Sequence, residues 1–154
     1  MEKPSGNLVL TEAGVNALNA LTGELQRDTG ARAVLLIEKS GQIVTAQGQT
    51  STLDTLSLAA LISGSFASTK ALARLLGEKH FKTLFQQGKT ESIFVVQLDT
   101  TDTLAVVFGQ AVTVGLVKFK TMQALERINA QMRALYTDKK PSLSNLSQSI
   151  DNLF

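Results

Sequence analysis

The sequence predicts one α+β domain, built from a five-stranded antiparallel sheet with helices on its faces. Two observations support this prediction. Apolar residues recur at helical spacing in three long segments, and short β-rich runs bounded by turn residues lie between those segments. The predicted order is helix, two strands, helix, three strands, helix. Strands joined by short turns pair as hairpins, so the expected architecture is an antiparallel sheet covered by helices.

The first helix and the first hairpin are expected in the first third of the chain. Residues 11–27 predict an amphipathic helix that ends at Gly30. Its apolar residues, three or four positions apart, are Val15, Leu18, Leu21 and Leu25. Residues 31–38 (ARAVLLIE) form an apolar run too short for a good helix, and a glycine-containing turn leads into residues 43–49. We therefore predict two strands joined by a tight turn.

The second half of the chain predicts a second hairpin and a closing helix. Residues 80–87 fit either a strand or a loop, and the order above counts them as a strand. Residues 92–98 and 104–109 are strong β runs around an aspartate-rich turn. Residues 114–135 carry one apolar helical stripe, formed by Met122, Leu125, Ile128, Met132 and Leu135.

The helix predicted over residues 52–76 is apolar on two sides. One face is expected to cover the sheet with Leu58, Leu61, Ile62, Ser65, Thr69, Leu72, Ala73 and Leu76. The opposite face collects small and apolar residues until its last turns: Leu53, Leu56, Ala60, Ser63, Gly64, Ala67, Lys70, Ala71 and Arg74. Phe66 is expected at the edge of this second face. Because a surface helix is normally polar there, we predict an interface with another helix; a merely helix-friendly surface is the alternative.

Composition places the chain among globular proteins. Of its 154 residues, 44% are hydrophobic and 18% are charged, which is enough apolar material for a core. The formal net charge is only +2, so nucleic-acid binding is not indicated. Lys118, Lys120, Arg127 and Arg133 flank one aromatic residue, Phe119, and fit a solvated helix face better than an RNA-binding platform.

Several kinds of chemistry lack the residues they require. The chain has no cysteine and one histidine, His80, so we expect no thiolate or histidine metal site, no cofactor and no catalytic triad. No glycine-rich phosphate-binding motif is present. Asp99 and Asp102 lie in a turn, where aspartates usually have a structural role. With no signal peptide or long apolar run, we expect a soluble cytoplasmic protein that neither enters a membrane nor acts as an enzyme.

Four segments together resemble the roadblock (dynein light-chain-like) domain family, which has a profilin-like fold. They are GARAVLLIEKSGQIVTAQGQ, DTLSLAALISGSFASTKALARLLGE, FKTLFQQGKTESIFVVQL and VGLVKFK. The similarity is greatest to bacterial members that regulate a Ras-like polarity GTPase. It implies a homodimer in which two sheets join and the second helices pair, and which stimulates GTP hydrolysis by repositioning the GTPase's own catalytic residues. It also implies a role in cell polarity or motility and a location at a cell pole.

The resemblance leaves two questions open, namely the role of two basic residues and the function of the protein. Lys70 and Arg74 could recognise an acidic switch surface of the GTPase, or they could be ordinary solvated charges. The protein could also be a scaffold that binds other roadblock or polarity proteins without affecting nucleotide turnover.

The last residues differ in composition from the rest. We assign residues 1–137 to the domain and residues 138–154 to a flexible polar tail with an apolar end. That end, IDNLF, resembles the end of some bacterial family members, in which the C-terminal extension contacts the GTPase. Ile150, Leu153 and Phe154 are therefore candidate docking residues on a tether, and a frayed terminus is the alternative.

Overall fold

The computed structural model describes residues 6–137 and contains three helices and seven strands in that range. In chain order these are β1 (Asn7–Leu8), α1 (Glu12–Thr29), β2 (Ala33–Ile37), β3 (Ile43–Gly48), α2 (Thr55–Leu75), β4 (Thr83–Gln87), β5 (Glu91–Gln97), β6 (Thr103–Gly109), α3 (Val114–Leu135) and β7 (Tyr136–Thr137). The predicted fold class and order of elements are confirmed, and the ambiguous segment before the second hairpin forms β4.

The main sheet has five antiparallel strands in the order β3-β2-β6-β5-β4. Strand β2 lies between β3 and β6 and is buried along its whole length. Its side chains alternate between the two faces, so that Val34 and Leu36 enter one core and Leu35 and Ile37 enter the other. This double burial explains why the strand reads as an uninterrupted apolar run.

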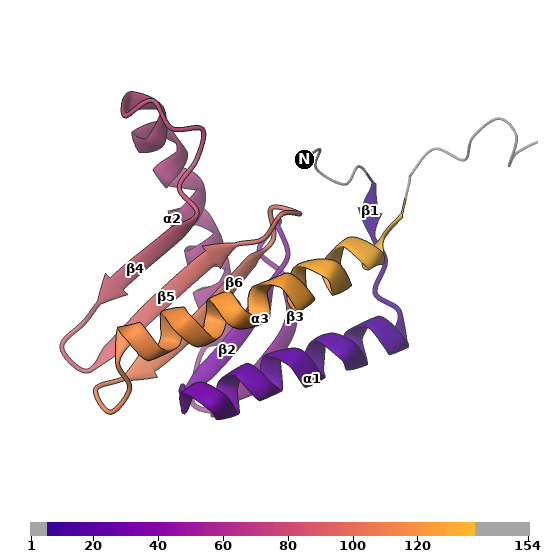
Figure 1. Ribbon diagram of the computed structural model, residues 1–154, viewed down its shortest axis with the longest axis horizontal. Coiled ribbons are helices and arrows are strands. Elements are labelled where there is room, and N and C mark those ends of the chain that lie inside the picture. Colours follow the sequence, from indigo (N-terminus) through magenta and orange to yellow (C-terminus); the bar gives the residue numbers. More distant parts are fainter. Residues whose placement is uncertain (1–5, 138–154) are drawn as a thin grey trace, which may run out of the picture.

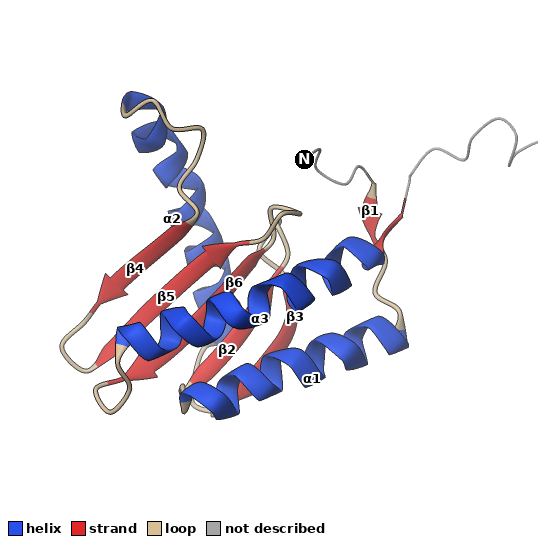
Figure 2. Ribbon diagram, viewed as in Figure 1, coloured by secondary structure: helices blue, strands red, loops and turns tan. Residues whose placement is uncertain are grey.

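Helices cover both faces of the sheet, and they do so unequally (Figure 1; Figure 2). Helices α1 and α3 lie side by side on one face and enclose the larger core with residues such as Leu18, Ile128 and Met132. Helix α2 is alone on the other face and closes a smaller core. One end of α2 projects past the sheet (Figure 1). The fold therefore has one fully covered face and one partly covered face.

A small second sheet joins the two ends of the described chain. Asn7 pairs with Thr137 and Leu8 pairs with Tyr136, in antiparallel register. The backbone N–H of Val9 also donates to the carbonyl of Leu135 at 2.8 Å. The sequence did not predict this pairing, because two-residue strands carry no periodicity of their own.

Helix boundaries differ slightly from the prediction, and capping groups account for the differences. Helix α1 starts where the Thr11 hydroxyl accepts from the backbone N–H of Gly14 at 3.1 Å. Helix α2 begins at Thr55 because Asp54 caps it, accepting from the N–H of Ser57 at 3.2 Å. Hydrogen bonding by Ser57 also lowers the pKa of Asp54.

Candidate interaction surface on helix α2

The inner face of α2 packs on the sheet through Ala59, Ile62, Phe66 and Ala73, which are all buried. Phe66, at 3% exposure, fills the space over Leu35, Val95 and Ala105 of the smaller core. The prediction that Phe66 lies at the edge of the exposed face is therefore wrong. A large aromatic ring at the centre of the contact buries a large apolar area in the smaller core.

The outer face of α2 and the C-cap residue that follows it expose five leucines: Leu56, Leu61, Leu72, Leu75 and Leu76. Their exposed fractions reach 76% at Leu56 and 84% at Leu75. The prediction that Leu61, Leu72 and Leu76 cover the sheet is wrong, because the buried stripe is rotated toward Phe66 and Ala59. The exposed apolar surface is consequently larger than the sequence indicated.

Most of the residues predicted for the interface do lie on this outer face. Ala60, Gly64, Ala67, Lys70, Ala71 and Arg74 are exposed, whereas Leu53 and Ser63 are half-buried. At Gly64 no other group of the described chain comes within 4 Å of the position that a Cβ atom would take. Packing within residues 6–137 therefore does not explain the glycine. We call this surface, from Leu56 to Leu76, the α2 face.

The α2 face continues into a free sheet edge. Strand β4 is at the end of the main sheet and pairs only with β5 among the described strands. The projecting end of α2 is followed by a loop, residues 76–82, that returns to β4 (Figure 1). An unpaired strand edge presents free backbone donors and acceptors, and it is a template for pairing with another chain. The exposed Leu72, Leu75 and Leu76 at the end of α2 and the free edge of β4 are thus joined by one loop.

A small polar hollow of about 90 Å³ borders the α2 face. It lies between α2 and the turns at one end of the sheet, and its lining includes Ser63, Ala67, Gln97, Thr103 and the two lysines Lys39 and Lys70. Neither lysine makes an ion pair within the described residues. Ammonium and hydroxyl donors at one place suit a carboxylate from another molecule.

A buried aspartate holds the turns beside this hollow. Asp102 accepts from the backbone N–H of Lys39 at 2.8 Å, the hydroxyl of Thr100 at 2.5 Å and the hydroxyl of Tyr136 at 2.7 Å. Burial raises the pKa of Asp102 in spite of these hydrogen bonds, and burial together with Asp102 raises the pKa of Tyr136. Sequence reasoning assigned Asp102 to a turn but missed this network, whose members come from three distant segments.

The other candidates from the sequence stay apart from this surface. His80 is exposed, and Asp99 forms an ion pair with Arg133 at 2.6 Å on the opposite side of the sheet from α2. Within residues 6–137 no group of three or more histidine, aspartate or glutamate side chains is placed to hold a metal ion. Ile150, Leu153 and Phe154 lie outside the described residues.

In the described part of the chain, α2 is the one helix long and apolar enough to qualify as a membrane span by length and composition. Soluble core helices meet the same criterion, and α2 packs one face on the sheet and carries Lys70 and Arg74 on the other. Its apolar outer face therefore fits a protein contact as well as a lipid one.

Comparison with known proteins identifies the family of this chain. The family model for the Roadblock/LC7 domain matches residues 6–108. The chain is similar to the solved structure of Myxococcus xanthus MglB, at 31% identity and a TM-score of 0.78 over 86% of this chain and 100% of that one. It is also similar to the gliding protein MglB from Thermus thermophilus, at 29% identity and a TM-score of 0.78 over 84% and 98% of the two chains.

A third similar structure is described as MglB with a tetrameric arrangement, at 28% identity and a TM-score of 0.80 over 85% and 98% of the two chains. No curated protein matches the chain.

Proposed function

Since the chain belongs to the Roadblock/LC7 domain family, we propose that it is a homodimeric, MglB-like regulator of a Ras-like small GTPase with no catalytic site of its own. The observation that carries this proposal is the exposed α2 face. Burying a leucine side chain is worth about 1.5–3 kcal/mol. Four outward leucines on one helix and a fifth at its C-cap are therefore a strong driving force for association.

The homodimer is proposed to form at the corner where α2 and β4 meet. A twofold axis there lets one patch serve both protomers, with the α2 helices packed antiparallel over their small residues. Pairing of the two β4 edges would join two five-stranded sheets into one, because β4 has a free edge. Ala60, Gly64 and Ala67 would allow the two helix backbones to approach closely.

The GTPase is proposed to bind the part of the α2 face that stays open in the dimer. Lys70 and Arg74 are exposed there, and Lys70 also lines the polar hollow. They suit an acidic surface on the switch region of an MglA-like partner. The expected effect is faster GTP hydrolysis through repositioning of the GTPase's own residues. Ile150, Leu153 and Phe154 are proposed as a tethered second contact with it, and the proposed setting is the bacterial cytoplasm, at a cell pole.

The test mixes the purified chain with the GTP-loaded Ras-like GTPase encoded beside it. We expect a complex by gel filtration and faster phosphate release. The double variant Lys70→Glu with Arg74→Glu should weaken both, whereas Arg27→Glu with Arg127→Glu, at exposed positions on α1 and α3, is the matched control. Deletion of Ser142–Phe154 should leave the domain folded and change affinity or nucleotide exchange. Absence of any complex or change in turnover would refute the proposal.

A second candidate function is a scaffold without effect on turnover. The similar protein described in a tetrameric arrangement favours assembly between roadblock chains. Complex formation with roadblock or polarity proteins and unchanged GTP hydrolysis would identify this function.

A further inference from the structure

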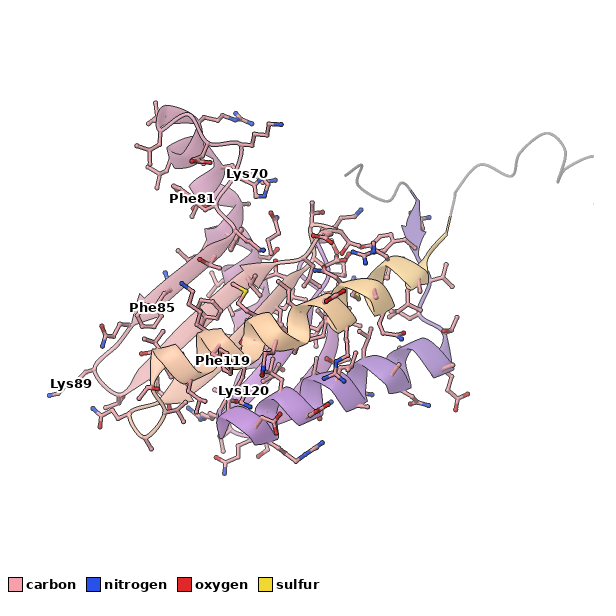
Figure 3. The ribbon with its side chains drawn as sticks, in the orientation of Figure 1. Lys70, Phe81, Phe85, Lys89, Phe119 and Lys120 are labelled. Carbon is pink, nitrogen blue, oxygen red and sulfur yellow. The ribbon has the colours of Figure 1, made fainter. Side chains whose placement is uncertain are left out.

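The face of the sheet opposite α2 carries a second exposed surface, at the beginning of α3. Its apolar members are Phe85 on β4 and Val114, Leu116 and Phe119 on α3, with Phe119 58% exposed. Its basic members are Lys89, Lys118 and Lys120. Figure 3 labels Phe85, Lys89, Phe119 and Lys120 around this end of α3. We call these seven residues the α3 patch.

Three residues of the α3 patch, Phe85, Lys89 and Val114, line a hollow of about 350 Å³. The rings of Phe85 and Phe108 stack with their centroids 6.2 Å apart and an interplanar angle of 11°. The side-chain amide of Gln110 donates to the backbone carbonyl of Lys89 at 2.6 Å, which ties the loop before α3 to the β4–β5 turn. The walls of the hollow are therefore held by contacts within the protein.

The charge of this patch is positive, and Lys120 is its one lysine that lies near acidic side chains, because it lines a small hollow between α1 and α3 with Glu24 and Asp28. None of its three lysines makes an ion pair within residues 6–137. The nearby Glu91 is already paired with Arg32 at 2.9 Å, and the first turn of α3 has no acidic residue. The helix dipole adds partial positive charge at this end of α3. The surface thus suits a segment that combines apolar side chains with a carboxylate.

The C-terminal segment of this same chain has that composition. Residues 150–154 read IDNLF, with three apolar side chains around Asp151. The distance also fits. The distance from Thr137 back to Phe119, measured along the helix axis at roughly 1.5 Å per residue, is about 27 Å. Residues 138–149 can span about 40 Å when extended, so the segment can return along α3 without strain.

We propose that Ile150–Phe154 docks on the α3 patch of its own chain when no partner is bound. Leu153 and Phe154 would cover Phe119 and the hollow beside Phe85, and Asp151 would face the lysines. This inference goes beyond the proposed function, since it concerns the free protein and leaves the α2 face open. The same segment would leave the α3 patch when it engages a GTPase.

The test uses the full chain with a nitroxide on Ser147→Cys, which is the only thiol because the chain has no cysteine. We expect loss of amide NMR signal at Phe85, Val114 and Phe119, and no loss on α2. Leu153→Glu and Phe119→Glu should each restore those signals. Gln123→Glu, which adds the same charge one turn along α3, should not. High salt should weaken the docking.

Three outcomes would overturn the proposal. Signal loss confined to the α2 face would place the segment there instead. If amide signals were lost only within the tail, the tail would not dock on the domain. In a mixture of nitroxide-labelled copies and separate isotope-labelled copies, the isotope-labelled copies could lose as much signal as a doubly labelled chain does. That result would show that the tail of a second chain occupies the patch. All three are measured without the GTPase, so they stay distinct from failure of the proposed function.

Discussion

The phenolic hydroxyl of Tyr136 lies 2.7 Å from a carboxylate oxygen of Asp102, although the two residues are 34 positions apart. The amino group of Lys39 lies 5.1 Å from the centroid of the same ring. These two contacts connect the end of α3 with the turns that border the α2 face.

Removing this hydroxyl should destabilise the domain. Tyr136→Phe keeps the ring under Lys39 but takes one donor from a buried carboxylate. Because hydrogen bonds to charged groups contribute about 1.5–3 kcal/mol and Tyr136 is half-buried, we expect a loss of about 1–2 kcal/mol in the free energy of unfolding. Urea denaturation at pH 7 measures it, and unchanged stability would show that Thr100 and Lys39 satisfy Asp102 alone.

The raised pKa of Asp102 predicts a specific pH dependence. Above pH 3.8 the carboxyl of Asp102 loses its proton in the unfolded chain but keeps it in the folded protein. The free energy of unfolding therefore falls as the pH rises toward the folded pKa. The free energy of unfolding of the wild type should therefore drop relative to Asp102→Asn across that window. Asp54, whose pKa is lowered, should give the opposite sign: its contribution is present above 3.8 and is lost on acidification. Equal slopes for the wild type and Asp102→Asn would contradict the assignment.

A buried hydroxyl without a partner offers a stabilising substitution. The hydroxyl of Thr121 is buried and makes no hydrogen bond with any group of residues 6–137. Thr121→Val keeps the shape and removes the unsatisfied group, so we expect a gain of about 1 kcal/mol. Thr22 is the matched control, because its hydroxyl donates to the carbonyl of Leu18 at 2.7 Å. Thr22→Val should lose about 1 kcal/mol. Thermal unfolding of both variants distinguishes the two environments.

A long charged side chain on the α2 face should prevent association. Ala67 is exposed, so Ala67→Arg should fold normally and should dissociate the proposed dimer by placing a charge where the two α2 helices are proposed to pack closely. Ala130→Arg, at an exposed position on α3, is the control. Light scattering after gel filtration measures the mass. A dimeric and fully active Ala67→Arg protein would show that the α2 face is not the interface.

The sequence predicted most of the fold because its signals are local. Glycine or turn residues separate the elements, and the run from Ala31 to Glu38 is apolar because β2 is covered on both faces. Strand β4 was ambiguous because it is a partly exposed edge strand with a weak pattern. Its place in the sheet follows from pairing with β5, which is a tertiary contact.

The orientation of α2 could not be predicted in the same way. A helix with leucines or alanines on every side has little contrast around its axis, so periodicity alone placed the buried stripe incorrectly. In the structure the buried stripe runs through Phe66, whereas Leu61 and Leu72 are exposed. The Asp102 network was missed for a related reason, since Lys39, Thr100 and Tyr136 meet only in three dimensions.

The pairing of β1 with β7 makes the described chain almost a closed ring. Because Asn7 and Thr137 are neighbours, a short peptide could connect them while the backbone is cut elsewhere, for example in the exposed turn at Lys89. Such a circular permutant should keep the same sheet order. It would also let a reporter domain be inserted at the α3 patch, on the face of the sheet opposite the helix on which association is proposed to depend.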